Sequence, residues 1–209
     1  MDVQAGFLIV KTYPRLYRDY AQRYDLRVPF YALPRVDKQP AESPIQYLGL
    51  DRDALDPYDK SDNLAEIRMD ELLKEGKCSE SGFIVSPDYV LEVRKFVSDP
   101  LDYEEVWTRI EGVSQEPPLG YVSVGYEPTY FSGDHFSASC DCMIFPRWHG
   151  TDREGTLFLE HFRELNAFGL FASAEAASSF LIYYLSFDWT ETGDYEIAEV
   201  FVPAAQIAN

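Results

Sequence analysis

The amino-acid sequence predicts an α+β protein, a single mixed domain in which a β-sheet is packed by several helices. Apolar runs of strand length and segments with helical periodicity are mixed along the chain, without the regular alternation of a parallel α/β fold. The chain has 209 residues, of which 46% are hydrophobic, and this is enough for one sizeable core. We therefore expect one domain over residues 1–209, with an N-terminal subregion 1–119 and an acidic C-terminal subregion 120–209.

The first predicted elements are a strand and a helix. Gly6 to Lys11 is a short apolar run typical of a buried strand. Thr12 can cap a following helix that carries Pro14 in its first turn. Tyrosines recur in this helix at helical spacing, namely Tyr13, Tyr17, Tyr20 and Tyr24. We expect this aromatic face to pack on the core. A base-stacking surface is the alternative, and the acidity of the rest of the chain argues against it.

A long loop rich in proline and aspartate is predicted near residues 33–62, with Ile45 to Leu50 as its strand candidate. The aspartates in this loop suggest a calcium site at first sight. The EF-hand spacing fails, however, because Leu55 occupies the fifth position and Asp62 replaces the terminal bidentate Glu. We expect a solvated acidic loop.

Three helices and then two strands are predicted in the middle of the chain. The helices span Asn63 to Glu75, Ser86 to Val97, and Asp102 to Ile110. In the second helix Ser86 is the N-cap and Pro87 lies in the first turn. The strands span Gly120 to Gly125 and Phe136 to Phe145. The latter is nearly all apolar or small on both faces, which is typical of a central strand.

The C-terminal third is predicted to contain two helices and a final strand. Thr151 and Glu154 form a capping box that starts the first helix. Its apolar face repeats at helical spacing up to a terminal cap at Gly169, through Leu157, Phe158, Phe162, Leu165 and Phe168. The second helix runs from Ser173 to about Leu185, with inward-facing Phe180, Leu181, Tyr184 and Leu185. A strand from Tyr195 to Val202 ends the series.

Acidity is the unusual feature of the composition. The net charge is −18, and residues 101–209 hold four Lys and Arg against 18 Asp and Glu. Such a field repels nucleic acid and anionic membranes and attracts basic proteins. The charge therefore favours a basic protein partner, with no direct nucleic acid and no membrane. Solubility alone is the alternative explanation.

The expected compartment is the cytoplasm. The apolar runs are far shorter than the roughly 20 residues of a membrane span, and the N-terminus lacks the basic and apolar regions of a secretory signal. The three cysteines, Cys78, Cys140 and Cys142, are an odd number at spacings that do not suit a disulfide scaffold. We expect reduced thiols and no cofactor.

A cluster of cysteines and histidines lies between residues 135 and 161. Zinc ligands could come from Cys140, Cys142, His149 and His135, but their spacing matches no standard zinc signature. Buried core cysteines are the expected interpretation, and His161 is expected to be half-buried on the apolar side of its helix. A metal-dependent or Cys/His-dependent hydrolase, using for example Cys142 with His149, stays open as an alternative.

No standard catalytic motif supports an enzyme. Residues 120–125 resemble the nucleophile elbow but carry one extra residue before Ser123, so the strained turn is not specified. The dinucleotide-binding glycine motif, the phosphate loop and the HExxH zinc motif do not occur. The sequence therefore points away from an enzyme and assigns no catalytic residue.

Two loops each combine a tryptophan with acidic groups, over Phe145 to Asp152 and over Phe187 to Asp194. An aromatic anchor ringed by carboxylates suits the binding of a basic protein, because aromatic burial gives affinity and charge gives rate. Two tryptophans folded as lids over the core are the alternative. The predicted partner-binding residues are Asp134, Asp141, Trp148, His149, Asp152, Asp188, Trp189, Glu191 and Asp194.

The segments FPRWHGTDREGTLFLEHF and LSFDWTETGDYEI resemble small acidic bacterial proteins that serve as immunity proteins of polymorphic toxin systems. The resemblance covers the chain from Gly125 to about Val200. It implies a cytoplasmic protein that binds and blocks a toxin domain, often a basic nuclease, through an acidic surface. A DNA mimic that inhibits a nucleic-acid-binding protein, and a scaffolding protein without an active site, are further alternatives.

Overall fold

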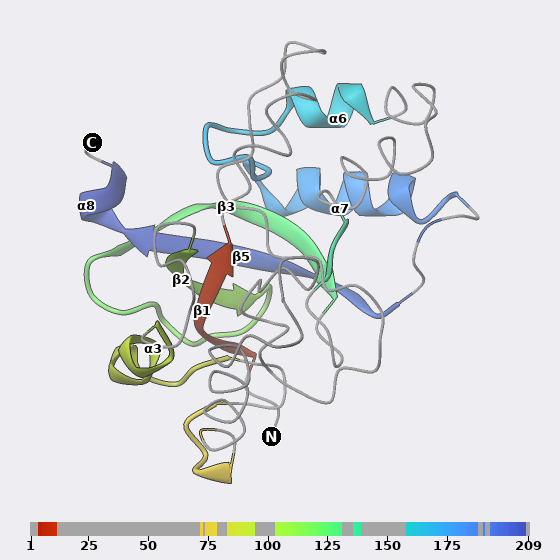
Figure 1. The fold of residues 1–209 in the computed structure, drawn as a ribbon. Coiled ribbons are helices and arrows are strands. Elements are labelled where there is room, and N and C mark those ends of the chain that lie inside the picture. Colours follow the sequence, from red (N-terminus) through yellow and green to blue (C-terminus); the bar gives the residue numbers. More distant parts are fainter. Residues whose placement is uncertain are drawn as a thin grey trace, which may run out of the picture.

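A computed structural model describes residues 4–11, 72, 74–78, 83–94, 103–130, 136–138, 158–187, 190 and 193–207. These residues form one five-stranded sheet of order β1-β2-β5-β3-β4, with helices packed against it (Figure 1). Each pair of neighbouring strands is antiparallel. The predicted α+β class is therefore confirmed.

The strands are β1 (Ala5–Lys11), β2 (Tyr103–Ile110), β3 (Tyr121–Tyr130), β4 (Phe136–Ser137) and β5 (Tyr195–Pro203). The helices are α3 (Pro87–Arg94), α6 (Leu159–Arg163), α7 (Ala174–Tyr184) and α8 (Ala204–Ile207). Strand β5 comes last in the sequence but lies centrally, between β2 and β3. The sheet therefore depends on a strand that is far in sequence from both of its neighbours.

The core has three clusters. Two of them lie on opposite faces of the sheet, because successive side chains of a strand point to opposite faces. Phe7, Trp107 and Phe201 pack on one face with Val90 of α3, and the Trp107 and Phe201 rings lie 5.2 Å apart. Aliphatic side chains fill the opposite face, including Leu8, Val106, Ala198, Val200 and Val202. The third cluster is mostly aromatic and joins α6 and α7 to the sheet through Phe158, Phe162, Phe171, Phe180, Tyr184 and Ile197.

Strands β1 and β3 are each contacted by a short segment that makes one pair of backbone hydrogen bonds with the strand. On β1, the amides and carbonyls of Phe7 and Ile84 bond reciprocally at 2.9 Å. On β3, Tyr126 and Phe171 do the same at 2.9 and 3.0 Å. The register of β3 against β5 shifts between Ser123 and Gly125, so a bulge lies beside the second contact.

Asn166 fastens the loop between α6 and α7 to this bulge. Its side-chain amide donates to the Val124 carbonyl at 2.6 Å. Its side-chain oxygen accepts from the amides of Phe168 at 2.8 Å and Leu170 at 3.3 Å. One side chain therefore satisfies the backbone of two segments that are distant in sequence.

Several predicted elements are confirmed. Strands β1 and β5 match the predicted strands, and β3 begins where predicted. Ser86 caps α3 by accepting from the Asp88 amide at 3.2 Å. Ser173 caps α7 by accepting from the Ala176 amide at 3.2 Å, and α7 ends at Tyr184, close to the predicted Leu185.

Several predictions are wrong in the described residues, and the predicted strand over Gly120 to Gly125 continues to Tyr130. Residues 103–110 form strand β2 and not a helix. Helix α6 ends at Arg163, and Phe168 and Gly169 lie in the turn that Asn166 holds. Leu185, expected to face inward, is 43% exposed and is the residue that follows the last turn of α7.

Other predictions fall partly or wholly outside the described residues. Leu72 and Lys74 are helical, as predicted for Asn63 to Glu75. The strand predicted from Phe136 was expected to be central, but β4 ends at Ser137, Ala138 is helical, and β4 is last in the order of the described strands. Outside the described residues lie the tyrosine helix after Thr12, the loop near 33–62, the capping box at Thr151 and the rest of this predicted strand. Among the residues described, no helix has the length and apolarity that crossing a membrane requires.

Candidate functional site

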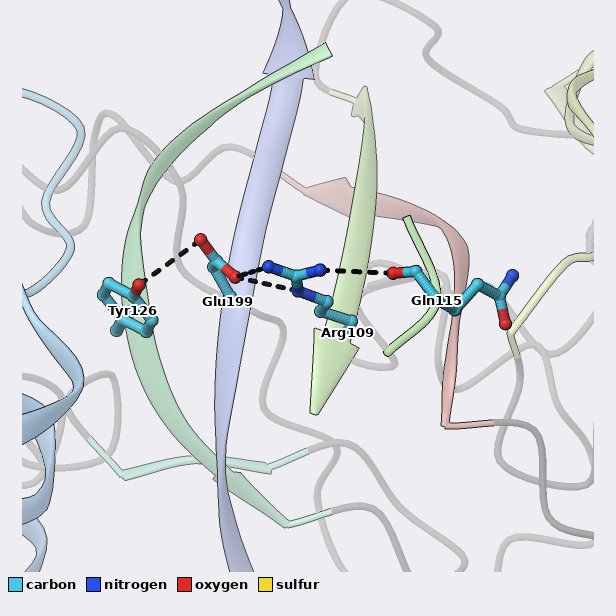
Figure 2. Close-up of polar contacts among 4 residues, drawn as sticks. All are labelled: Arg109, Gln115, Tyr126 and Glu199. Carbon is cyan, nitrogen blue, oxygen red and sulfur yellow. Dashed lines mark hydrogen bonds and ion pairs between the residues drawn. The ribbon is translucent and has the colours of Figure 1, made fainter. Parts of the chain in front are cut away.

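An ion pair links β2 to β5, the strand at the centre of the sheet (Figure 2). Arg109 of β2 lies directly opposite Glu199 of β5, and its Nε and Nη2 atoms lie 2.9 and 2.8 Å from Glu199 Oε2. The Tyr126 hydroxyl of β3 donates to Glu199 Oε1 at 3.3 Å, and Arg109 Nη1 donates to the Gln115 carbonyl at 3.3 Å. The four residues therefore form a polar line across β3, β5 and β2.

This line is only partly accessible to solvent. The side chains of Arg109 and Glu199 are 23% and 12% exposed, and the guanidinium lies 5.1 Å from the centre of the Phe201 ring. Burial, together with the negative charge of Glu199, raises the pKa of Tyr126. Because the guanidinium is already occupied by Glu199, Gln115 and Phe201, its geometry suits cross-strand bracing better than capture of an anion.

A second polar contact lies at the start of β3. The Tyr121 hydroxyl donates to Glu105 Oε1 of β2 at 2.5 Å, and the Tyr121 ring meets Phe7 edge-on with centroids 6.0 Å apart. Burial raises the pKa of Tyr121, and the hydrogen bond to Glu105 adds to this effect. Tyr121 therefore stays protonated near neutral pH. It links β3 to β2 by its hydrogen bond to Glu105 and to β1 by its ring contact with Phe7.

The most accessible candidate for binding is a surface on α6 and α7, which we call the α6–α7 surface: Glu160, His161, Glu164, Glu175, Ile182, Tyr183, Leu185 and Phe187. Ile182 is 73% exposed and Leu185 is 43% exposed, although both are large apolar residues. The carboxylates of Glu160, Glu164 and Glu175 are exposed on the same two helices. Glu160 is paired with Arg163 at 2.5 Å, so this pair adds no net charge and the negative charge of the surface comes from Glu164 and Glu175.

Aromatic contacts hold this surface in shape. The His161 ring lies 5.1 Å from Tyr183 and 5.7 Å from Phe180, and is half-buried as predicted. Phe158 lies 5.6 Å from Tyr183 and 5.5 Å from Phe187. Because these rings interlock α6 with α7, the exposed side chains are presented on a pre-organised base, which lowers the entropy cost of binding.

The residues with reactive side chains that the sequence singled out and the structure describes are His161, Cys78 and Ser123. Within them no hydrogen bond reaches the His161 imidazole, and no group of three His, Cys, Asp or Glu residues could hold a metal ion. Burial raises the pKa of the Cys78 thiol to about 12, which suppresses the reactive thiolate. Ser123, the serine of the imperfect elbow motif, is an exposed residue of strand β3.

Of the predicted partner-binding residues, the structure describes Asp194. It is exposed just before β5, and burial together with the charge of Asp194 raises the pKa of Glu196. Outside the described residues lie Asp134, Asp141, Trp148, His149, Asp152, Asp188, Trp189 and Glu191, together with the alternative metal ligands His135, Cys140 and Cys142. Phe187, the first residue of the second predicted loop, has its ring 5.5 Å from that of Phe158, which follows the first predicted loop in sequence.

Sequence reasoning missed two groups of residues. Arg109 and Glu199 are 90 positions apart, and no local pattern joins them, least of all with β2 predicted as a helix. Ile182 could have been found, since it lies off the inward stripe of the helix that was predicted correctly. Comparison of the chain with protein-family models, curated proteins and solved structures finds no match.

Proposed function

We propose that this protein binds a basic protein partner and neutralises it, and that the α6–α7 surface is part of the contact. The observation that carries the proposal is that Ile182 and Leu185 are exposed at the C-terminal end of α7, while Glu164 and Glu175 are exposed on the same pair of helices without a basic partner among the described contacts. Large apolar side chains at the centre of a contact supply affinity, and surrounding carboxylates steer a basic partner toward it.

The charge of the whole chain supports the same partner chemistry. A net charge of −18 raises the association rate with a basic protein and disfavours nucleic acid and anionic membranes. The resemblance to immunity proteins suggests a toxin domain, such as a basic nuclease, as the partner. The proposal therefore places the protein in the cytoplasm, where such a nuclease would meet its nucleic-acid substrate.

Binding to purified basic nuclease domains tests the proposal by titration calorimetry. We expect wild-type protein to bind at least one of them, with affinity that falls as salt rises from about 0.05 to about 0.5 M because screening shortens the Debye length. Ile182→Asp should weaken this binding by at least about tenfold, since it removes an apolar contact at the centre of the surface. Leu91→Asp is the matched control, because Leu91 is exposed on α3, away from the α6–α7 surface.

A second pair of variants isolates the role of charge. Glu164→Lys should weaken binding more than Glu116→Lys, although both change the net charge equally and both residues are exposed. Glu116 lies in the connection between β2 and β3. If Glu116→Lys weakens binding as much as Glu164→Lys, the net charge is responsible and the α6–α7 surface is not the contact. If no basic domain binds in a salt-sensitive way, the function itself is refuted.

A further inference from the structure

Two segments at one end of the sheet carry no charged residue, in contrast to the acidity of the chain. The carboxylate that reaches them is that of Glu105 on β2, which is half-buried and bound by the Tyr121 hydroxyl. Residues 117–123 and 201–207, which we call the uncharged tip, contain no Asp, Glu, Lys, Arg or His. The start of β3 pairs with the end of β5 here, and the Ala204 amide at the start of α8 donates to the Gly120 carbonyl at 2.8 Å. In Figure 1 this end lies at the left with α8, while α6 and α7 lie at the upper right.

The uncharged tip exposes apolar side chains. Leu119 is fully exposed in the turn before β3, Ile207 is 46% exposed on α8, and Val122 is 37% exposed on β3. Every residue of α8 is exposed. Exposed apolar side chains gathered where charge is absent are typical of a contact surface rather than of a solvated one.

The backbone of the tip also offers a strand edge. On the outer side of β3, the described contacts begin at the Val124 carbonyl, which Asn166 binds, and at Tyr126, which pairs with Phe171. Among the described residues, no strand pairs with Val122 or Ser123 on that side. Edge strands are protected from pairing by charged side chains, prolines or bulges. Val122 and Ser123 carry no charge, and the open edge is the short stretch between Pro118 and the bulge that follows Ser123.

We propose that the uncharged tip is the contact between two copies of this chain. The β3 edges would pair antiparallel across a two-fold axis near Val122, with Leu119 of each copy packing beside the paired strands. An antiparallel edge is complementary to itself, so one surface on both copies suffices.

Charge favours a second copy over other occupants. Two chains of net charge −18 repel each other, and contact through residues that carry no charge adds less repulsion than contact through an acidic surface. The Glu105 carboxylate beside the tip is half-buried and already bound by Tyr121, so it offers a basic protein little to bind, and an anionic membrane is repelled by the rest of the molecule. Self-association should therefore strengthen with salt, which is opposite to the salt effect expected for binding a basic partner.

Sedimentation equilibrium of the full chain tests the proposal at concentrations up to roughly 100 µM. We expect a monomer–dimer equilibrium whose dissociation constant falls when salt rises from about 0.05 to about 0.5 M. Val122→Lys should weaken dimerisation by at least about tenfold, because a lysine on an edge strand opposes pairing. This variant lowers the net negative charge, so stronger repulsion between copies cannot explain the loss.

Two further variants secure the interpretation. Leu119→Lys changes a fully exposed turn residue that folding does not need, and it should also weaken the dimer. Ile182→Lys makes a similar change on α7 and should leave the dimer intact. A protein that stays monomeric at both salt concentrations, or a dimer that persists in both Val122→Lys and Leu119→Lys, would overturn the proposal. A dimer disrupted by Ile182→Lys alone would place the contact on α7 instead.

Discussion

The two sides of the sheet solve the same packing problem with different geometry. Phe7 of β1 pairs with Ile84, Tyr126 of β3 pairs with Phe171, and a glycine precedes each in sequence. A Cβ atom on Gly6 would lie 2.9 Å from Phe83 Cβ and 3.0 Å from the Ile84 carbonyl oxygen. A Cβ atom on Gly125 would lie 2.7 Å from both Leu170 Cβ and the Phe171 carbonyl oxygen.

The difference lies in the backbone. Gly125 has a φ of +145°, which L side chains rarely adopt, whereas Gly6 is not among the glycines with positive φ. The β3 side therefore requires glycine for both space and conformation, and it adds the three hydrogen bonds of Asn166. The β1 side requires glycine for space alone. We infer that the β3 side tolerates change less well.

Gly125→Ala should have the largest effect in this comparison. It combines contacts at 2.7 Å with a strained φ, and we expect a loss of about 3 kcal/mol or more in the free energy of unfolding. Urea denaturation followed by circular dichroism measures this loss. Gly112→Ala is the control for φ alone, because Gly112 has a φ of +87° and no atom within 4 Å of its Cβ position. Equal losses for the two variants would show that space around Gly125 does not matter.

The same glycine explains what the sequence could and could not predict in β3. A strand was predicted over Gly120 to Gly125, whereas a glycine inside a strand often marks a bulge and not its end. The strand continues to Tyr130 because Gly125 lies in a bulge, and the bulge is held by Asn166, which lies far along the chain. Strands β1 and β5 needed no such distant information, since their apolar residues alone indicate burial.

Strand β2 was mispredicted for a related reason. Its sequence, YEEVWTRI, contains Glu and Arg, which favour helices. The alternation of apolar and polar residues that indicates a strand is hidden, because the polar Glu105 and Arg109 share the face of the buried Trp107. Glu105 and Arg109 are tolerated on that face because Tyr121 and Glu199 bind them. Both partners come from other strands, so no local pattern could show them. The exposure of Ile182 on α7, by contrast, could have been inferred from a helix that was predicted almost to its ends.

Gly6→Ala should have an intermediate effect. Its contacts at 2.9 and 3.0 Å require Phe83 and the Ile84 segment to shift, but the backbone conformation is available to alanine. We expect a loss of about 1–2 kcal/mol, consistent with overpacking without strain. The measurement is the same urea denaturation, made in parallel with Gly125→Ala. A loss for Gly6→Ala as large as that for Gly125→Ala would contradict the proposed difference between the two sides.

The smallest effects concern the tyrosines of β3 at high pH. Tyr121 reaches β2 and β1 through Glu105 and Phe7, whereas Tyr126 reaches only as far as Glu199 on the adjacent strand. Burial raises the pKa of both phenols in the folded protein, so each contributes stability that is fully present below the unfolded pKa of about 10 and is lost as pH rises further.

Replacement by phenylalanine should therefore flatten the fall in unfolding free energy between about pH 9 and about pH 11, and more so for Tyr121→Phe than for Tyr126→Phe. At neutral pH, Tyr121→Phe should cost about 1 kcal/mol through the lost hydrogen bond to Glu105, and Tyr126→Phe should cost less because its bond is 3.3 Å long. Urea denaturation across this pH range measures both effects. An alkaline slope as steep as wild type in both variants would show that other groups, and not these two tyrosines, determine the alkaline limit of the fold.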